Sequence, residues 1–85
     1  MSIQIEPHTL ERARERGASE DEIVDTINSG IQIAAKSGRI GKAKVFKFNS
    51  IRDGKYFEEK KIEVFYVIEN QDIVTVTVYV FYGKF

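Results

Sequence analysis

The sequence has no cysteine and a single histidine among its 85 residues. Without cysteine, the chain forms no disulfide, offers no thiolate ligand for zinc or an iron–sulfur cluster, and has no cysteine nucleophile. A single histidine also excludes every site that needs two imidazole groups. The sequence therefore predicts neither metal-dependent chemistry nor a bound cofactor.

Long hydrophobic runs are also absent, and the longest uninterrupted apolar stretch covers only residues 64–68. A membrane-spanning helix needs about 20 predominantly apolar residues. The first residues show no basic region followed by an apolar stretch, which is the pattern of a signal peptide. We therefore expect a cytoplasmic protein that has no membrane partner.

The formal net charge is 0, because 13 Lys and Arg residues balance 13 Asp and Glu residues. With 42% hydrophobic and 31% charged residues, the composition is typical of a soluble globular domain. The length predicts a single domain over residues 1–85. A domain of this size buries only about 60–65% of the surface of its unfolded chain, so association into a homodimer would add stability.

The neutral total hides a segregation of charge along the chain. Residues 1–35 carry an excess of acidic side chains, residues 36–61 are strongly basic, and residues 62–85 are again acidic. A basic segment can attract phosphate groups even on a neutral protein, because salt confines its field to about 8 Å. Alternatively, the lysines protect edge strands against aggregation.

Two short helices are expected in the N-terminal third, over residues 7–16 and 20–29. Gly17 ends the first helix, since glycine favours the left-handed conformation at a helix C-terminus. Ser19 and Glu22 have the spacing of a capping box, in which each side chain accepts a hydrogen bond from the other residue's amide. These signals predict an N-terminal helical hairpin.

From residue 31 onward the hydrophobic period changes to two, and β-branched and aromatic residues dominate. A bulge is expected near residues 58–60. The fold class is therefore α+β, with the helical hairpin packed on a three- to four-stranded antiparallel sheet in two layers. The expected strands are Ile31–Ala35, Ala43–Phe48, Tyr56–Glu69 and Ile73–Tyr82.

The last strand has two chemically different faces if its side chains alternate regularly. One face consists of valines and is expected beneath the helices: Val74, Val76, Val78 and Val80. The other face mixes hydroxyl groups with rings: Ile73, Thr75, Thr77, Tyr79 and Phe81. This second face is either a binding site or an ordinary half-exposed strand surface. The aromatic tail over residues 81–85 is expected to dock on the body of the protein or on a second subunit.

His8, Arg12 and Arg16 are spaced by four residues and therefore form one stripe on the first helix. A histidine exchanges a proton near neutral pH, and guanidinium groups bind phosphate in a fixed geometry. The stripe thus suits phosphodiester chemistry. The alternative is a solvated helix face on which the arginines form weak ion pairs with Glu11 and Glu15.

Aromatic residues make up 12% of the chain, and several lie near the basic segment. Interleaved aromatic and basic side chains can stack on the bases of single-stranded RNA and hold its phosphates, which makes RNA a candidate partner. Lys44 and Lys47 flank Val45 and Phe46 and are the cations best placed on a strand to contact a phosphate. Most of the rings are nevertheless needed for the core of so small a domain.

One pattern of spaced residues runs through most of the chain. It consists of His8, Glu11-Arg12, Glu15-Arg16-Gly17, the segment 18–23, a loop that ends near Gly30, and the late strand over 73–79. This pattern resembles the bacterial domain-of-unknown-function family 4258. That family is similar, at a greater distance, to the BrnT toxins and, more loosely, to the RelE-like ribonucleases. The resemblance implies two helices followed by an antiparallel sheet.

The resemblance also implies a function, namely metal-independent RNA cleavage by the toxin of a toxin–antitoxin pair, with a cognate antitoxin as protein partner. In such a site His8 would act as acid or base, Arg12 and Lys47 would hold the phosphate, and Tyr79 would position or stack on the RNA. Further candidates for phosphate or RNA binding are Arg16, Lys44 and Thr77.

A second interpretation is a non-catalytic module that dimerises or binds a protein partner. The zero net charge and the aromatic chain end favour it. On this interpretation the contact surface would be the aromatic face of the last strand together with the tail.

Overall fold

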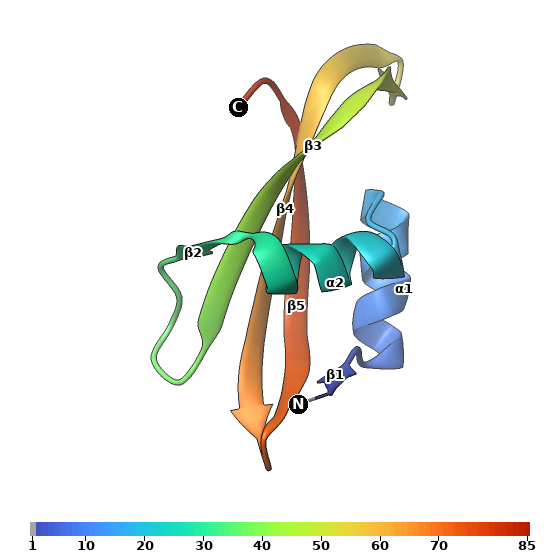
Figure 1. Cartoon of the computed structure of the whole chain (residues 1–85). Helices are drawn as coiled ribbons and strands as arrows, with labels where there is room; N and C mark the ends of the chain where they lie inside the picture. The colour runs from blue at the N-terminus through green and yellow to red at the C-terminus, as the bar shows by residue number, and fades with distance from the viewer. Residues whose placement is uncertain (1) are drawn as a thin grey trace.

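The computed structural model describes residues 2–85, in which two helices pack on a five-stranded sheet (Figure 1). In chain order, the elements are β1 (Ile3–Gln4), α1 (Pro7–Arg16), α2 (Glu20–Ser29), β2 (Ile31–Ile33), β3 (Ile40–Arg52), β4 (Lys55–Glu69) and β5 (Asp72–Gly83). The strand order across the sheet is β1-β5-β4-β3-β2. β1 pairs with β5 in parallel, and the other neighbours are antiparallel. The α+β class is confirmed, but the sheet is mixed and larger than predicted.

The extra strand is β1, which the sequence analysis missed. Ile3 pairs with Ile73, and Gln4 pairs with Val74. Asp72 helps to hold this segment, because its Oδ1 accepts hydrogen bonds from the Ser2 amide at 3.1 Å and the Ser2 hydroxyl at 2.8 Å. A strand of two residues is too short to show alternation, and its partner lies at the other end of the chain.

The helices begin and end at the predicted residues. Gly17 has a φ of 98° and caps α1 in the left-handed conformation. Both capping-box hydrogen bonds of α2 are present: the Glu22 amide donates to Ser19 Oγ at 3.1 Å, and the Ser19 amide donates to Glu22 Oε1 at 3.0 Å. The caps therefore fix the helix ends, as the sequence indicated.

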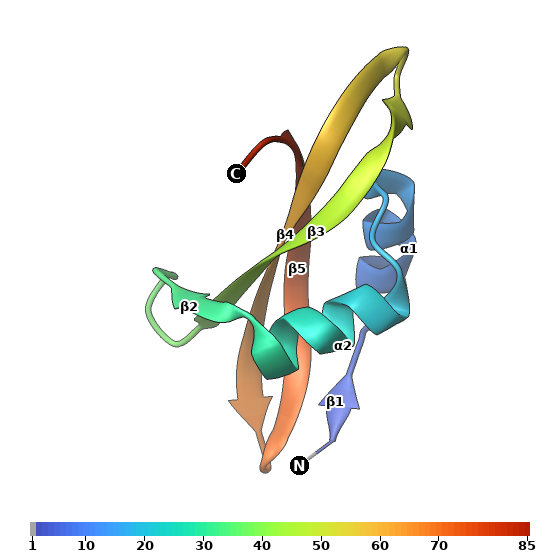
Figure 2. The same ribbon diagram turned by 45° about the horizontal axis from the view of Figure 1, so that its top comes forward.

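The two helices do not form the predicted hairpin of antiparallel neighbours. α2 crosses over β3 and β4, whereas α1 runs alongside β5, so the helix axes lie at a steep angle to each other (Figures 1 and 2). α1 has little apolar surface to share with α2, since Ala13 is its one buried residue. Each helix therefore packs mainly against the sheet.

The predicted valine face of β5 is wrong in the N-terminal half of the strand. The pairing register shifts between Phe65 and Tyr66, so that Phe65 opposes Thr77 and Tyr66 opposes Thr75. Val76 is thus the extra residue of a β-bulge, and side chains on its two sides alternate in opposite phase. Facing the helices are Ile73, Thr75, Val78 and Val80; on the other face lie Val74, Thr77, Tyr79 and Phe81.

The predicted bulge near residues 58–60 is also misplaced. The irregularity of the β3–β4 pair lies on β3, between Lys47 and Ser50, where Asn49 has a φ of 44°. β3 is longer than predicted, because residues 49–52 continue as strand, and the turn to β4 is confined to Asp53-Gly54. β2 is shorter than predicted and ends at Ile33.

The core lies between the helices and the sheet. Its fully buried members include Ala13 of α1, Ile23 of α2, and Ile62 and Val64 of β4. We call the opposite face of the sheet the open face, because within residues 2–85 no helix lies over it. No helix in this described range is long and apolar enough to cross a membrane.

A buried ion pair joins α2 to the sheet. Lys60 of β4 is only 10% exposed in its side chain, and its Nζ lies 2.9 Å from Glu22 Oε2 and donates to the Gly17 carbonyl at 2.8 Å. Burial by itself would raise the pKa of Glu22, but hydrogen bonds from Ser19 and Lys60 outweigh it and hold that pKa below its ordinary value of 4.5. The charge of Glu22 is therefore part of the folded structure.

We expect Glu22→Gln to lower the free energy of unfolding by about 2 kcal/mol at pH 7, as measured by urea denaturation. The glutamine keeps an oxygen for the Ser19 amide but leaves the Lys60 charge unpaired. Breaking a fully buried pair costs about 3–5 kcal/mol, and the 25% exposure of the Glu22 side chain reduces this. If Glu22→Gln/Lys60→Met is as unstable as Glu22→Gln alone, the pairing account is wrong.

The same pair predicts a pH dependence. Because the pKa of Glu22 is lower in the folded state than in the unfolded state, its contribution to stability is present above about pH 4.5 and is lost as the pH falls through the folded-state pKa. The stability difference between wild type and Glu22→Gln should therefore shrink between about pH 5 and pH 3. A difference that stays constant over this range would contradict the assignment.

Candidate functional site

α1 lies along the edge of β5, in the place that a further strand would occupy. β1 pairs with β5 at Ile73 and Val74, and α1 follows along the same edge (Figure 2). Thr9 Oγ1 donates to the Val76 carbonyl at 3.4 Å, and Arg16 Nη1 donates to the Val78 carbonyl at 2.6 Å. Side chains of α1 thus satisfy carbonyl groups of the strand edge.

A pocket of about 200 Å³ opens between this helix and this strand, and we call it the α1–β5 pocket. It gathers the whole predicted stripe of α1, because the four-residue spacing places these side chains on the helix face that turns toward β5. Its lining residues are His8, Thr9, Arg12, Arg16, Val76, Thr77 and Val78.

The three charged or titratable side chains of the pocket differ in how they are held. Arg16 is half-buried and fixed by its hydrogen bond to Val78, and its guanidinium carbon lies 5.5 Å from the centre of the Tyr79 ring. His8 and Arg12 are exposed. The pocket therefore combines one positioned guanidinium with a second guanidinium and an imidazole that face solvent.

The β-bulge at Val76 contributes to this arrangement. It turns Ile73 and Thr75 toward the helices, while Thr77 and Tyr79 lie on the open face, next to the edge that Arg16 covers. Bulges commonly re-aim side chains near binding sites. Nothing in the alternation of the sequence indicated the bulge, although Thr77 and Tyr79 were already predicted on the non-helix face.

Lys44 and Lys47, the two predicted phosphate ligands on β3, lie outside the pocket. Lys44 points toward the helices, where its Nζ contacts Asp25 Oδ2 at 2.8 Å and Ser29 Oγ at 2.9 Å. The hydrogen bond from Lys44 lowers the pKa of Asp25. Lys47 is exposed on the open face, in register with Glu59. The structure does not bring either lysine to His8.

A larger hollow, of about 460 Å³, lies on the open face on the other side of β5, and we call it the open-face hollow. Lys36 and Arg39 from the β2–β3 connection line it together with Phe65, Thr77 and Tyr79. Thr77 lines both this hollow and the α1–β5 pocket. Sequence reasoning missed Lys36, Arg39 and Phe65 as site residues, and the basic middle segment was the only signal for the first two.

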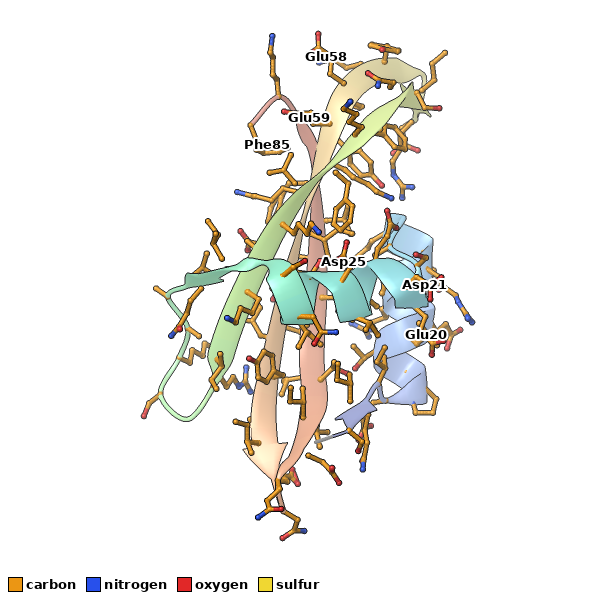
Figure 3. The ribbon with its side chains drawn as sticks, in the orientation of Figure 1. Glu20, Asp21, Asp25, Glu58, Glu59 and Phe85 are labelled. Carbon is orange, nitrogen blue, oxygen red and sulfur yellow. The ribbon has the colours of Figure 1, made fainter. Side chains whose placement is uncertain are left out.

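Acidic side chains gather on the helix side of the molecule. Glu20 and Asp21 lie at the start of α2, and Asp25 lies further along it (Figure 3). The open-face hollow, in contrast, has two cations and no carboxylate among its lining residues. An anionic ligand is therefore favoured in the α1–β5 pocket and the open-face hollow over the helix side.

The donor set of the α1–β5 pocket suits an anion better than a metal ion. Its lining residues include one imidazole, two guanidinium groups and no carboxylate. Across residues 2–85, no cluster of three or more His, Asp or Glu side chains is arranged to hold a metal ion. Guanidinium groups bind phosphate oxygens through paired hydrogen bonds, so a phosphate group is the ligand that this chemistry favours.

The sequence matches the family described as Domain of unknown function (DUF4258) over residues 5–80. The chain belongs to the DUF4258 family. No curated protein and no solved structure matches the chain at a significant level. The DUF4258 match includes every residue that lines the α1–β5 pocket and the open-face hollow, whereas Phe81 and the residues after it lie outside the matched segment.

Proposed function

We propose that this protein is a metal-independent endoribonuclease and that the α1–β5 pocket is its active site. The observation that carries the proposal is the gathering of His8, Arg12 and Arg16 in one pocket beside β5. An imidazole supplies proton transfer near neutral pH, and two guanidinium groups supply positive charge where a phosphate gains negative charge.

The proposed reaction is a transesterification within the RNA. The ribose 2′-oxygen attacks the adjacent phosphorus, and the bond from phosphorus to the 5′-oxygen of the next nucleotide breaks. His8 accepts the proton of the 2′-hydroxyl, and the departing 5′-oxygen takes a proton from water, which reaches the exposed His8 side of the pocket. The products are a 2′,3′-cyclic phosphate and a 5′-hydroxyl end.

The two arginines have different roles in this proposal. Arg16 is already held by the Val78 carbonyl, so it needs little reorganisation to present its remaining N–H groups to a phosphate oxygen. Arg12, which is exposed, clamps the same phosphate from one turn earlier on α1. Tyr79 supports the site by its cation–π contact with Arg16.

We further propose that the protein acts as a toxin in the bacterial cytoplasm. Support comes from the resemblance of the DUF4258 family to the BrnT toxins and, more loosely, to the RelE-like ribonucleases. The helices α1 and α2 precede the antiparallel strands β2 to β5, as that resemblance implies. An antitoxin encoded nearby would then be its protein partner. Lys44 and Lys47 have no role in this proposal, because they lie away from the pocket.

Induced expression in a bacterial host tests the proposal. We expect the wild type to arrest growth and fragment total RNA, while a folded His8→Ala/Arg12→Ala variant does neither, because it lacks the proton acceptor and one phosphate ligand. Growth curves and RNA electrophoresis measure these effects, and circular dichroism of the purified variant checks its fold. Equal growth arrest and equal RNA fragmentation by both proteins would contradict the proposal.

A second candidate function is dimerisation through the part of the open face that lies near the C-terminus of the chain. Val45, Phe81 and Phe85 lie there around Lys61, whose Nζ is 5.4 Å from the Phe81 ring centre and 5.0 Å from that of Phe85. The Phe85 amide donates to Glu59 Oε1 at 2.6 Å, which holds the chain end beside β4 (Figure 3). A mass in solution of twice the monomer mass, lost in Phe81→Ser, would favour this function.

A further inference from the structure

The open-face hollow is lined by aromatic and basic side chains that take no part in the core between the helices and the sheet. Phe65 and Tyr79 meet there edge to face, with ring centres 6.0 Å apart and planes at 73°. Gly41 makes room for this corner, because a Cβ at its position would come within 2.9 Å of the Phe65 ring. Tyr79 is nevertheless 43% exposed. An aromatic corner thus faces solvent, on the side of the sheet opposite the core.

Cations border this corner on two sides. Lys36 and Arg39 line the hollow from the β2–β3 connection. Arg16 approaches from the opposite side, over the edge of β5, and its guanidinium carbon lies 5.5 Å from the Tyr79 ring centre. Ring faces with cations around them match the parts of a nucleotide, whose base stacks on aromatic groups and whose phosphates need positive charge.

The hollow and the α1–β5 pocket are neighbours across one strand. Thr77 lines both, and Arg16 lines the pocket while contacting Tyr79 of the hollow. A nucleic acid strand with one phosphate at Arg12 and Arg16 would therefore have an adjacent base within reach of Tyr79. The volume of about 460 Å³ falls in the range of small-ligand pockets, about 300–1,000 Å³, which suits one base.

We propose that the open-face hollow binds an unpaired nucleobase, stacked on Tyr79 with Phe65 beside it, and that the substrate class is single-stranded RNA. This inference rests on the proposed phosphate site at Arg12 and Arg16. Within a duplex both faces of each base are already stacked, so a duplex cannot place a base against these rings. Lys36 and Arg39 contact a further phosphate of the same strand.

Binding of a fluorescein-labelled 2′-O-methyl oligonucleotide tests the inference, with fluorescence anisotropy as the readout. This RNA analogue lacks the 2′-hydroxyl nucleophile, so binding is measured without cleavage. We expect Tyr79→Val to weaken binding about ten- to a hundredfold, as loss of a stacked base does. Tyr79→Phe, which keeps the ring, should bind like the wild type. The wild type should bind the single strand more tightly than the same sequence in a duplex.

Phe81→Val is the matched control, because Phe81 has a similar exposure of 44% on the same face but lies outside the hollow. It should bind the oligonucleotide like the wild type. Lys36→Ala should lower the slope of log affinity against log salt by about 1, since it removes one phosphate contact.

Several results would overturn the inference: unchanged affinity of Tyr79→Val, equal losses for Tyr79→Val and Phe81→Val, or equal binding of duplex and single strand. A fall in the mass of the protein in solution caused by Tyr79→Val would assign the hollow to a protein contact instead. Tyr79-dependent binding without any cleavage of ordinary RNA would sustain the nucleobase site and reject the ribonuclease. Cleavage that needs His8 but not Tyr79 would sustain the ribonuclease and reject the nucleobase site.

Discussion

We expect His8→Ala to lower the rate of RNA cleavage by about 10²- to 10⁴-fold, which is the range for loss of a general acid or base. His8 is exposed on the first turn of α1 and lines the α1–β5 pocket. In the proposed mechanism its removal takes the proton acceptor away, and it leaves the core intact. The cleavage rate of a 5′-labelled single-stranded RNA at saturating protein concentration measures the effect.

Two further variants on α1 separate proton transfer from phosphate binding. Arg12→Ala should weaken the affinity for RNA as well as the rate, because it removes a phosphate ligand. Arg14→Ala is the control: Arg14 is exposed on the same helix but does not line the pocket. If Arg14→Ala loses as much activity as Arg12→Ala, or if His8→Ala keeps the wild-type rate, the assignment of the pocket fails.

We expect Gly17→Ala to lower the free energy of unfolding by about 3 kcal/mol. The φ of 98° puts Gly17 in the left-handed region, where a side chain costs roughly 1–2 kcal/mol. A Cβ would also collide with the hydroxyl of Tyr82, and such overpacking costs typically 1–3 kcal/mol. That hydroxyl donates to the Arg16 carbonyl at 2.6 Å, and burial raises the pKa of Tyr82, which keeps the donor protonated.

Gly38→Ala is the matched control for this prediction. Gly38 also has a positive φ, of 81°, but nothing lies within 4 Å of the position that its Cβ would take. Gly38→Ala should lower the free energy of unfolding only by the backbone strain of a side chain in the left-handed region, roughly 1–2 kcal/mol. Urea denaturation of the two variants measures the difference. Equal destabilisation would mean that the contact between Gly17 and Tyr82 contributes nothing.

The aromatic tail therefore splits into two parts. Tyr82 docks on the body, where its ring lies 5.1 Å from that of Phe48 and 4.9 Å from the guanidinium carbon of Arg52. Arg52 in turn donates to the Glu15 carbonyl at 2.7 Å, which ties the β3–β4 hairpin to the end of α1. Phe85 stays half-exposed on the open face.

The helices were predictable because their signals are local. Gly17 and the Ser19–Glu22 capping box lie within a few residues of the ends that they fix, and both helices have the predicted bounds. The angle between the helices was not predictable in the same way. It depends on where the sheet offers apolar surface to α1 and α2, and this surface comes from residues 40–80 of β3, β4 and β5.

The sheet was predictable in outline and wrong in register. Alternation identified β3, β4 and β5, but the bulge at Val76 has no local signature among so many β-branched residues. One extra residue reverses the faces beyond it, so the valine face was predicted correctly only at Val78 and Val80. β1 was not predicted because it consists of two residues whose pairing depends entirely on β5.

The candidate site was likewise predictable only where its residues lie close together in the sequence. The stripe of His8, Arg12 and Arg16 could be predicted because four-residue spacing on a helix fixes a common face. The open-face hollow could not, since Lys36, Phe65 and Tyr79 come from three separate segments that only the sheet register brings together. Lys44 looked free in the sequence, but Asp25 pairs with it across the helix–sheet layer.

The chemistry of the RNA ends tests the central claim most directly. The purified protein is incubated with a single-stranded RNA in the presence of a metal chelator, and the products are analysed by mass spectrometry. Our account predicts 2′,3′-cyclic phosphate and 5′-hydroxyl ends, with no product when the RNA is fully 2′-O-methylated and almost none with His8→Ala. Intact RNA after incubation with the folded wild type, or cleavage that persists in His8→Ala, would contradict the account.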